Sequence, residues 1–158
     1  MPEHRDPIYT AEARVIGGRG NGHGRSSDGA LDVDLRLPRE MGGDGGGTNP
    51  EQLFAVGYAA CFESALGSVA RRRRKEQEVG DVAIQARVML VPTKERTFVL
   101  EVELDVRLPS VTDPGEAEVL VRGAHELCPY SNATRGNVDV KLIVNGRELG
   151  DASTGLAA

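Results

Sequence analysis

The segment TNPEQLFAVGYAACFESALGSVA, residues 48–70, joins a helix-start signal to a long apolar run. Thr48 or Asn49 can cap a helix, and Pro50 fits the first turn because its missing N–H would be unsatisfied there in any case. Glu51 follows, where its carboxylate faces the positive end of the helix dipole. The sequence therefore predicts a helix that begins near Pro50.

The rest of this helix, residues 53–70, is apolar on most sides and rich in alanine and glycine. A helix that is apolar all round has to be buried all round, which a single small domain rarely achieves. We therefore expect a second subunit to cover part of it, since its small residues would let another backbone approach closely. The cations of RRRRKEQ, residues 71–77, oppose the negative end of the dipole, and we interpret them as a solvated helix end.

Apolar periodicity outside this helix predicts strands, whose expected ranges are 8–16, 31–37, 82–92, 98–108 and 138–144. The third and fourth strands flank TKER and predict a hairpin. Two glycine-rich segments, residues 17–25 and 41–47, predict loops.

A second helix is expected after the hairpin, capped near Asp113, started by Pro114 and stopped by Pro129. Cys128 then lies on or beside the buried stripe of this helix. The order of elements predicts an α+β fold, in which a largely antiparallel sheet packs against two main helices.

The whole chain has 158 residues and a formal net charge of -5. Its length predicts one domain over residues 1–150, and DASTGLAA, residues 151–158, predicts a flexible tail. The acidic total gives no reason to expect nucleic acid as a partner, despite the local arginine run. The sequence begins without the apolar core of a signal peptide, and no window approaches the roughly 18 apolar residues of a membrane span. We therefore expect a cytoplasmic protein without a membrane partner.

The chain contains two cysteines, Cys61 and Cys128. In a reducing compartment, two cysteines suit metal binding or redox work better than a permanent bridge. Taken alone, each also fits an inert, buried apolar filler.

Two longer motifs contain these cysteines, TNPEQLFAVGYAACF at residues 48–62 and CPYSNATRGNVDV at residues 128–140. Together they resemble the cysteine motifs of the organic hydroperoxide resistance (Ohr) proteins, which are lipoyl-dependent thiol peroxidases of the Ohr/OsmC superfamily. The resemblance implies an OsmC-like fold and an interwoven homodimer with a central buried helix and two active sites at the interface. It also implies an enzyme that needs no bound cofactor or metal and takes its electrons from dihydrolipoyl groups on lipoylated proteins.

The resemblance further implies roles for four residues. Cys61 is the thiol that attacks the peroxide and becomes a sulfenic acid, and Cys128 is the resolving thiol that converts this acid to a disulfide. Arg19 in GGRG is the activating cation, and Glu51 in NPEQ is its carboxylate partner. The apolar surroundings of Cys61 fit alkyl or fatty-acid hydroperoxides better than hydrogen peroxide.

Elementary chemistry supports the need for a cation near Cys61. Only a thiolate attacks peroxide, and apolar surroundings raise the pKa of a thiol, so burial alone opposes catalysis. Arg19 taken by itself fits a solvent-facing loop arginine, and Glu51 fits a plain first-turn carboxylate. Ten residues separate Glu51 from Cys61, about 15 Å of helical rise, which is too far for one guanidinium to contact both on the same helix. We hypothesise that Arg19 bridges Cys61 of one subunit and Glu51 of the other.

Other chemical sites have weaker sequence support. His4, His23 and His125 with the two cysteines lack the paired spacing of zinc ligands. GGDGGGTNPEQ, residues 42–52, has the outline of a phosphate-binding turn but lacks its Lys-Ser/Thr signature, and a carboxylate there would repel an anion.

The sequence also departs from the family pattern in two places. Glu63 and Ser64 stand where relatives carry aliphatic or small residues, and we expect them to alter a surface rather than the activity. The segment after Arg19 is longer and richer in glycine than is common, so that Arg25 could compete for the role of Arg19.

Two alternative functions follow from the same residues. One is an OsmC-like peroxidase with a different peroxide preference. The other is a redox sensor or binding module without catalytic turnover.

Overall fold

The computed structural model describes residues 5–150, and the chain separates into two compact units that divide after Pro50. The assignment of residues 1–150 to a single domain stays a prediction. The predicted tail at residues 151–158 lies outside the described residues, as does His4.

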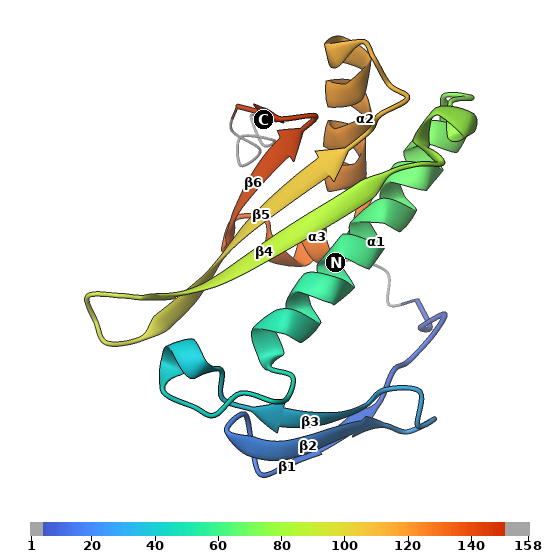
Figure 1. Ribbon diagram of the computed structural model, residues 1–158. Helices are drawn as coiled ribbons and strands as arrows, with labels where there is room; N and C mark the ends of the chain where they lie inside the picture. The colour runs from blue at the N-terminus through green and yellow to red at the C-terminus, as the bar shows by residue number, and fades with distance from the viewer. Residues whose placement is uncertain (1–4, 151–158) are drawn as a thin grey trace. The chain divides into compact units, whose positions relative to one another are not determined.

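The first unit contains a three-stranded antiparallel sheet in the order β1-β2-β3, formed by Ala13–Ile16, Asn21–Ser26 and Asp32–Arg36 (Figure 1). A short 3-10 helix, η1 (Arg39–Met41), follows. The first strand starts at Ala13 rather than at residue 8, so the N-terminal part of that prediction is wrong.

The strand β2 occupies most of the glycine-rich segment for which we expected a loop, and that prediction is also wrong. Glycine hides the alternation of a strand because it has no side chain to face either side. At Gly22 the absence of a side chain is required, because a Cβ atom there would collide with the carbonyl oxygens of Gly18 and Ile16. The tight turn before β2 therefore selects glycine without ending the sheet.

The second unit contains a four-stranded sheet in the order β4-β5-β6-β7, formed by Ala83–Pro92, Phe98–Arg107, Asp139–Val144 and Arg147–Glu148. The predicted hairpin of β4 and β5 is confirmed, with antiparallel pairing from Ala83 opposite Arg107 to Pro92 opposite Phe98 (Figure 1). The pair β5 and β6 is parallel, because the helices between them carry the chain back to the starting edge. The strands of the chain are thus mostly antiparallel but lie in two sheets.

Three α-helices belong to the second unit: α1 (Pro50–Arg72), α2 (Pro114–Leu127) and α3 (Pro129–Thr134). A 3-10 helix, η2 (Glu76–Val79), follows α1. The predicted cap of α2 is confirmed, since the carboxylate of Asp113 accepts hydrogen bonds from the N–H groups of Gly115 and Glu116, each at 3.3 Å. The helix α3 was not predicted, although Pro129 both ends one helix and suits the first turn of the next.

The core of the second unit lies between these helices and the sheet. Its fully buried large apolar side chains come from α1, α2, the two central strands and the residue that follows β5: Tyr58, Phe62, Leu66, Leu104, Leu108, Leu120, Leu142, Val102, Val106, Val121 and Val144. On α1 the core covers one side only, and Val56 on another side is 71% exposed. The complete burial expected for this helix is therefore not provided within one chain.

The helix α1 is also long and apolar enough to cross a membrane, with a mean hydropathy of 1.4 over an 18-residue window. The expectation that no stretch approaches such a span is wrong by this measure. The measure rests on length and composition alone, and the core helix of a soluble protein passes it as well. In this chain, 28% of the window is buried.

Candidate active site

Cys61 lies in the middle of α1, half-buried and packed against the core. Phe54 and Tyr58 lie at spacings of seven and three residues before it, which places all three side chains toward one face of the helix. The rings of Phe54 and Tyr58 contact the ring of Tyr130, with centroid distances of 5.9 and 5.6 Å. A Cβ atom at Gly57 would lie 2.7 Å from the hydroxyl oxygen of Tyr130, so glycine lets this ring approach the helix closely.

Cys128 lies at the junction between α2 and α3 and is completely buried. Its backbone is extended, with φ of -66° and ψ of 124°. A residue before proline is disfavoured in the helical conformation, so Pro129 forces this break. The junction still satisfies its backbone groups, because the N–H of Cys128 donates to the carbonyl of Ala124 at 2.8 Å and its carbonyl accepts from the N–H of Asn132 at 2.9 Å.

The fold brings the two cysteines together although they lie far apart in the sequence. Their thiols lie close enough for Cys128 to affect the ionisation of Cys61, and both are free. The backbone N–H of Tyr130, in the first turn of α3, is near enough to the sulfur of Cys61 to favour its charged form. Neighbouring cysteines of this kind can form a disulfide if their Cα and Cβ atoms reach the required separation.

Burial raises the pKa of the Cys61 thiol, and this is the largest influence on it. The hydrogen bond from the Tyr130 amide lowers this pKa, whereas the neighbouring Cys128 raises it. Within one chain the balance favours the protonated thiol. This agrees with the argument from sequence that activation of Cys61 requires a cation.

The structure places Arg19 and Glu51 in different units. Arg19 is half-buried in the turn between β1 and β2, and Glu51 is half-buried in the first turn of α1, as predicted. Their predicted roles, and the bridge from Arg19 to Cys61, stay predictions. Arg25 lies on β2 and forms an ion pair with Asp32 at 3.4 Å, so its side chain has a structural partner in its own unit.

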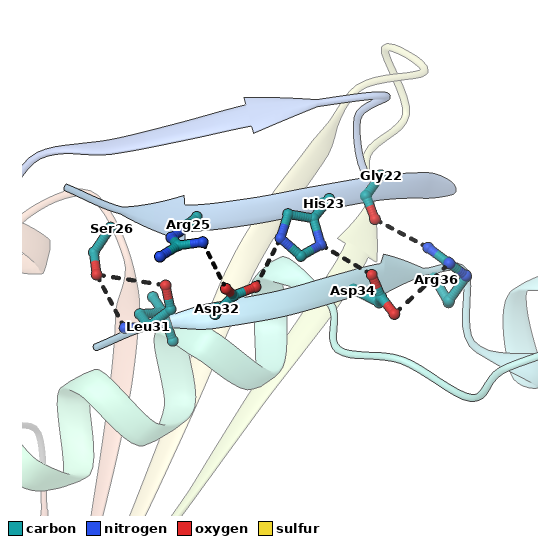
Figure 2. A network of polar contacts seen from close by, with 8 residues as sticks. All are labelled: Gly22, His23, Arg25, Ser26, Leu31, Asp32, Asp34 and Arg36. Atoms are coloured by element: carbon teal, nitrogen blue, oxygen red, sulfur yellow. Dashed lines mark hydrogen bonds and ion pairs between the residues drawn. The ribbon is translucent and has the colours of Figure 1, made fainter. Parts of the chain in front are cut away.

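His23 in the first unit lies between two carboxylates of the neighbouring strand (Figure 2). Its Nε2 is 2.7 Å from Asp32 and its Nδ1 is 2.9 Å from Asp34, both at Oδ1. His125 in the second unit is instead buried, with Nδ1 2.9 Å from the hydroxyl of Ser131. Among residues 5–150, no three His, Cys, Asp or Glu side chains are grouped so that they could hold a metal ion.

The sequence indicated no role for Ser131 or Tyr58 and did not predict the hydrogen bond of His125. The hydroxyl of Tyr58 lies 2.9 Å from Ser131 Oγ and 3.2 Å from Thr134 Oγ1. One signal in the sequence could have pointed to Tyr58: it lies three residues before Cys61 on a predicted helix, and therefore on the same face.

Comparisons with known proteins identify the class to which this arrangement belongs. The family model described as OsmC-like protein matches residues 43–143. A crystal structure of an organic hydroperoxide resistance protein from Legionella pneumophila has a TM-score of 0.82 at 52% identity, covering 88% of this chain and 98% of that chain. The chain therefore belongs to the OsmC-like family.

Several similar proteins within this family are named organic hydroperoxide resistance proteins. One from Xanthomonas axonopodis pv. citri is 50% identical over 138 residues, covering 85% of this chain and 93% of the relative. OhrB of Bacillus subtilis is 47% identical over 137 residues, covering 85% of this chain and 96% of the relative. The chain is thus placed among the organic hydroperoxide resistance proteins, as its cysteine motifs predicted.

Proposed function

We propose that this protein is a thiol peroxidase that reduces organic hydroperoxides to alcohols. The Cys61 thiolate attacks the terminal peroxide oxygen, the O–O bond breaks, and the alkoxide leaves and takes up a proton to become the alcohol. Cys61 is then a sulfenic acid. Cys128 attacks the Cys61 sulfur, the hydroxyl leaves as water, and a disulfide forms.

The proximity of the two thiols within one chain, seen in the influence of Cys128 on Cys61, supports this proposal most directly. A sulfenic acid at Cys61 would form beside its resolving partner, before a second peroxide could oxidise it further. The N–H of Tyr130 would remain beside the sulfur and stabilise negative charge on it.

The surroundings of Cys61 support an organic rather than an inorganic peroxide. The rings of Phe54, Tyr58 and Tyr130 form an aromatic cluster on the face of α1 that carries Cys61. An alkyl chain packs favourably against such rings, whereas hydrogen peroxide gains nothing from them.

Activation of Cys61 is assigned to Arg19, with Glu51 orienting the guanidinium. The raised pKa of the Cys61 thiol in the isolated chain supports the need for this cation. A guanidinium next to a thiolate favours the charged form of the sulfur and lowers its pKa.

The active species is proposed to be a homodimer. Apolar side chains are exposed on both units, with Ile16 on β1 64% exposed and Val56 on α1 71% exposed. Covering large apolar side chains with another protein surface removes them from water and is favourable. A second copy would cover these side chains and complete the burial of α1.

A dithiol must reduce the Cys61–Cys128 disulfide after each cycle. We assign this step to dihydrolipoyl groups on lipoylated proteins, whose two thiols become a disulfide as the protein regains its own. The cycle needs no metal or bound cofactor and fits a cytoplasmic protein that responds to oxidative stress.

The test is peroxide-dependent oxidation of dihydrolipoamide by the native protein and by Cys61→Ser and Cys128→Ser. We expect turnover for the native protein, none for Cys61→Ser, and a single oxidation of Cys61 without turnover for Cys128→Ser. Full turnover by Cys61→Ser would overturn the proposal.

The same assay separates the two alternatives. A peroxidase of different preference would turn over hydrogen peroxide faster than tert-butyl or fatty-acid hydroperoxides. A redox sensor would be oxidised once and would not turn over with any dithiol.

A further inference from the structure

A buried chain of polar side chains joins all three α-helices of the second unit. The hydroxyl of Tyr58 on α1 contacts those of Ser131 and Thr134 on α3, at 2.9 and 3.2 Å. Ser131 Oγ also lies 2.9 Å from Nδ1 of His125 on α2. Tyr58 and Ser131 are completely buried, and His125 is 7% exposed. Because a buried polar group is costly unless it is hydrogen-bonded, these contacts favour one arrangement of the helices.

Tyr58 is suited to this position because it stays neutral. Burial is the largest influence on its hydroxyl and raises its pKa above the ordinary value. A neutral phenol can donate one hydrogen bond and accept another, so it can serve both hydroxyls of α3.

Two of these hydrogen-bonded residues flank Cys128 in the sequence. His125 lies three residues before Cys128 and Ser131 lies three residues after it, so their hydrogen bond spans the break between α2 and α3. Arg135 spans the same break, because its Nη2 donates to the carbonyl oxygen of His125 at 2.8 Å. These bonds fix the angle at which Pro129 redirects the chain.

The same hydrogen bonds also involve α1, the helix that carries Cys61. Tyr58 precedes Cys61 by three residues, which is about one turn of α1. Its hydroxyl therefore ties the turn that carries Cys61 to the helix that starts at Cys128.

We propose that Tyr58, Ser131 and His125 are positioning residues that hold Cys128 against Cys61 for disulfide formation, an inference that rests on the proposed peroxidase function. The first oxidation of Cys61 by a hydroperoxide does not involve Cys128. The second step does, because the Cys128 sulfur must reach the Cys61 sulfur as water leaves. Loss of positioning therefore slows the second step more than the first.

A slower second step has a chemical signature. A sulfenic acid that waits for Cys128 can react with a second hydroperoxide, which transfers one oxygen to the sulfur and leaves as the alcohol. The product is a sulfinic acid, which a dithiol does not reduce. Variants of the positioning residues thus inactivate themselves during turnover.

The test uses Tyr58→Phe and Ser131→Ala in the full-length protein. The phenylalanine keeps the ring in the core and removes only the hydroxyl. After one equivalent of tert-butyl hydroperoxide, quenched alkylation and mass spectrometry give the rate of disulfide formation and the sulfinic fraction. We expect disulfide formation to slow about tenfold, and the sulfinic fraction per cycle to rise about tenfold, in Tyr58→Phe.

Asn145→Gly is the matched control. The Asn145 side chain makes three hydrogen bonds elsewhere in the second unit, to backbone groups of Leu108 and Val111, and glycine tolerates its φ of 47°. This variant should lower the melting temperature without changing the sulfinic fraction. An unchanged sulfinic fraction in both Tyr58→Phe and Ser131→Ala, or an equal increase in the control, would overturn the inference.

A second measurement does not depend on peroxide. Oxidised glutathione is allowed to form a mixed disulfide at Cys61, and the release of glutathione as Cys128 closes the protein disulfide is followed. Closure should be about tenfold slower in Tyr58→Phe than in the native protein. If the native protein does not reduce hydroperoxides but closure is slower in Tyr58→Phe, the proposed function is wrong and the positioning role stands. If the native protein turns over hydroperoxides but closure is equally fast in both proteins, the positioning role is wrong and the proposed function stands.

Discussion

The sheet of residues 5–50 and the helix-covered sheet of residues 51–150 are stabilised in different ways. Among the described residues of the first unit, Leu35 is the one apolar side chain that is buried. In addition to their backbone pairing, its strands β2 and β3 make exposed contacts of His23 and Arg25 with the carboxylates of Asp32 and Asp34 (Figure 2). The second unit contains a continuous apolar core from α1 to the end of β6.

This difference indicates which unit can stand alone. A three-stranded sheet becomes stable by burying an apolar face, and exposed ion pairs add little. The first unit thus needs another surface to cover it, whereas the second unit has an apolar core of its own and leaves one side of α1 exposed. Both cysteines lie in the self-sufficient unit, and the predicted activating cation Arg19 lies in the dependent one.

The largest effect expected from this comparison concerns the core. Leu66→Ala removes a completely buried side chain of α1 and should lower the free energy of unfolding by about 3 kcal/mol. Ile16→Ala, on the exposed face of β1, should change the stability of the separated chain by less than about 0.5 kcal/mol. Urea unfolding at low protein concentration measures both, and equal losses would remove the distinction between the units.

A second substitution tests what covers the first unit. Ile16→Glu places a charge on the exposed apolar face of β1, and it should weaken a homodimer about tenfold or more because that charge would lose its water on association. Sedimentation at several concentrations gives the dissociation constant. Ile16→Val is the control, and an unchanged dimer in Ile16→Glu would show that this face is not covered by a second copy.

A third substitution sharpens the account of the second unit. Asp113→Ala removes the side-chain cap of α2 and should cost about 1 kcal/mol of stability. Asp113→Asn should retain most of it, since its amide oxygen can still accept these bonds. If thermal unfolding shows the same loss for both variants, the cap is not the cause.

The smallest effect concerns the polar surface of the first unit. The hydrogen bond to Asp34 raises the pKa of His23, so the stability from this contact is complete below about pH 6.5 and is lost as the pH rises through the folded-state pKa. The same bond lowers the pKa of Asp34, so its contribution is present above that group's ordinary pKa of 3.8 and is lost as the pH falls through the folded-state value.

These two signs together predict that the contact is strongest at mildly acidic pH. His23→Gln should lower the melting temperature slightly at about pH 5.5 and have no effect at about pH 8.5. A larger effect at the alkaline pH would contradict the assignment. An NMR titration of the His23 ring gives the raised pKa directly.

The elements predicted correctly from the sequence were those with clear local signals at their ends. Asp113 and Pro114 mark the start of α2, and TNPEQ marks the start of α1, because caps and prolines act within one turn. The strand β2 was missed because Gly22 and Gly24 erase the alternation on which strand prediction depends. The helix α3 was missed because six residues after a proline carry too little periodicity to distinguish a helix from a turn.

The sequence predicted the two cysteines of the candidate site but not the groups that surround them. The cysteine motifs pointed to Cys61 and Cys128, but sequence separation says nothing of spatial contact. The N–H of Tyr130 carries no sequence signal, because every residue other than proline has one. The contact between Tyr58 and Ser131 joins residues 73 positions apart and depends on how α1 and α3 pack.

The central claim is that Cys61 and Cys128 act as one redox pair. It is tested most directly by treating the reduced protein with one equivalent of an organic hydroperoxide and mapping its peptides without reduction. We predict that both thiols disappear together, and that a single linked peptide pair joins Cys61 to Cys128 within one chain. Retention of both thiols, or oxidation of Cys61 with Cys128 still free in the native protein, would contradict the account.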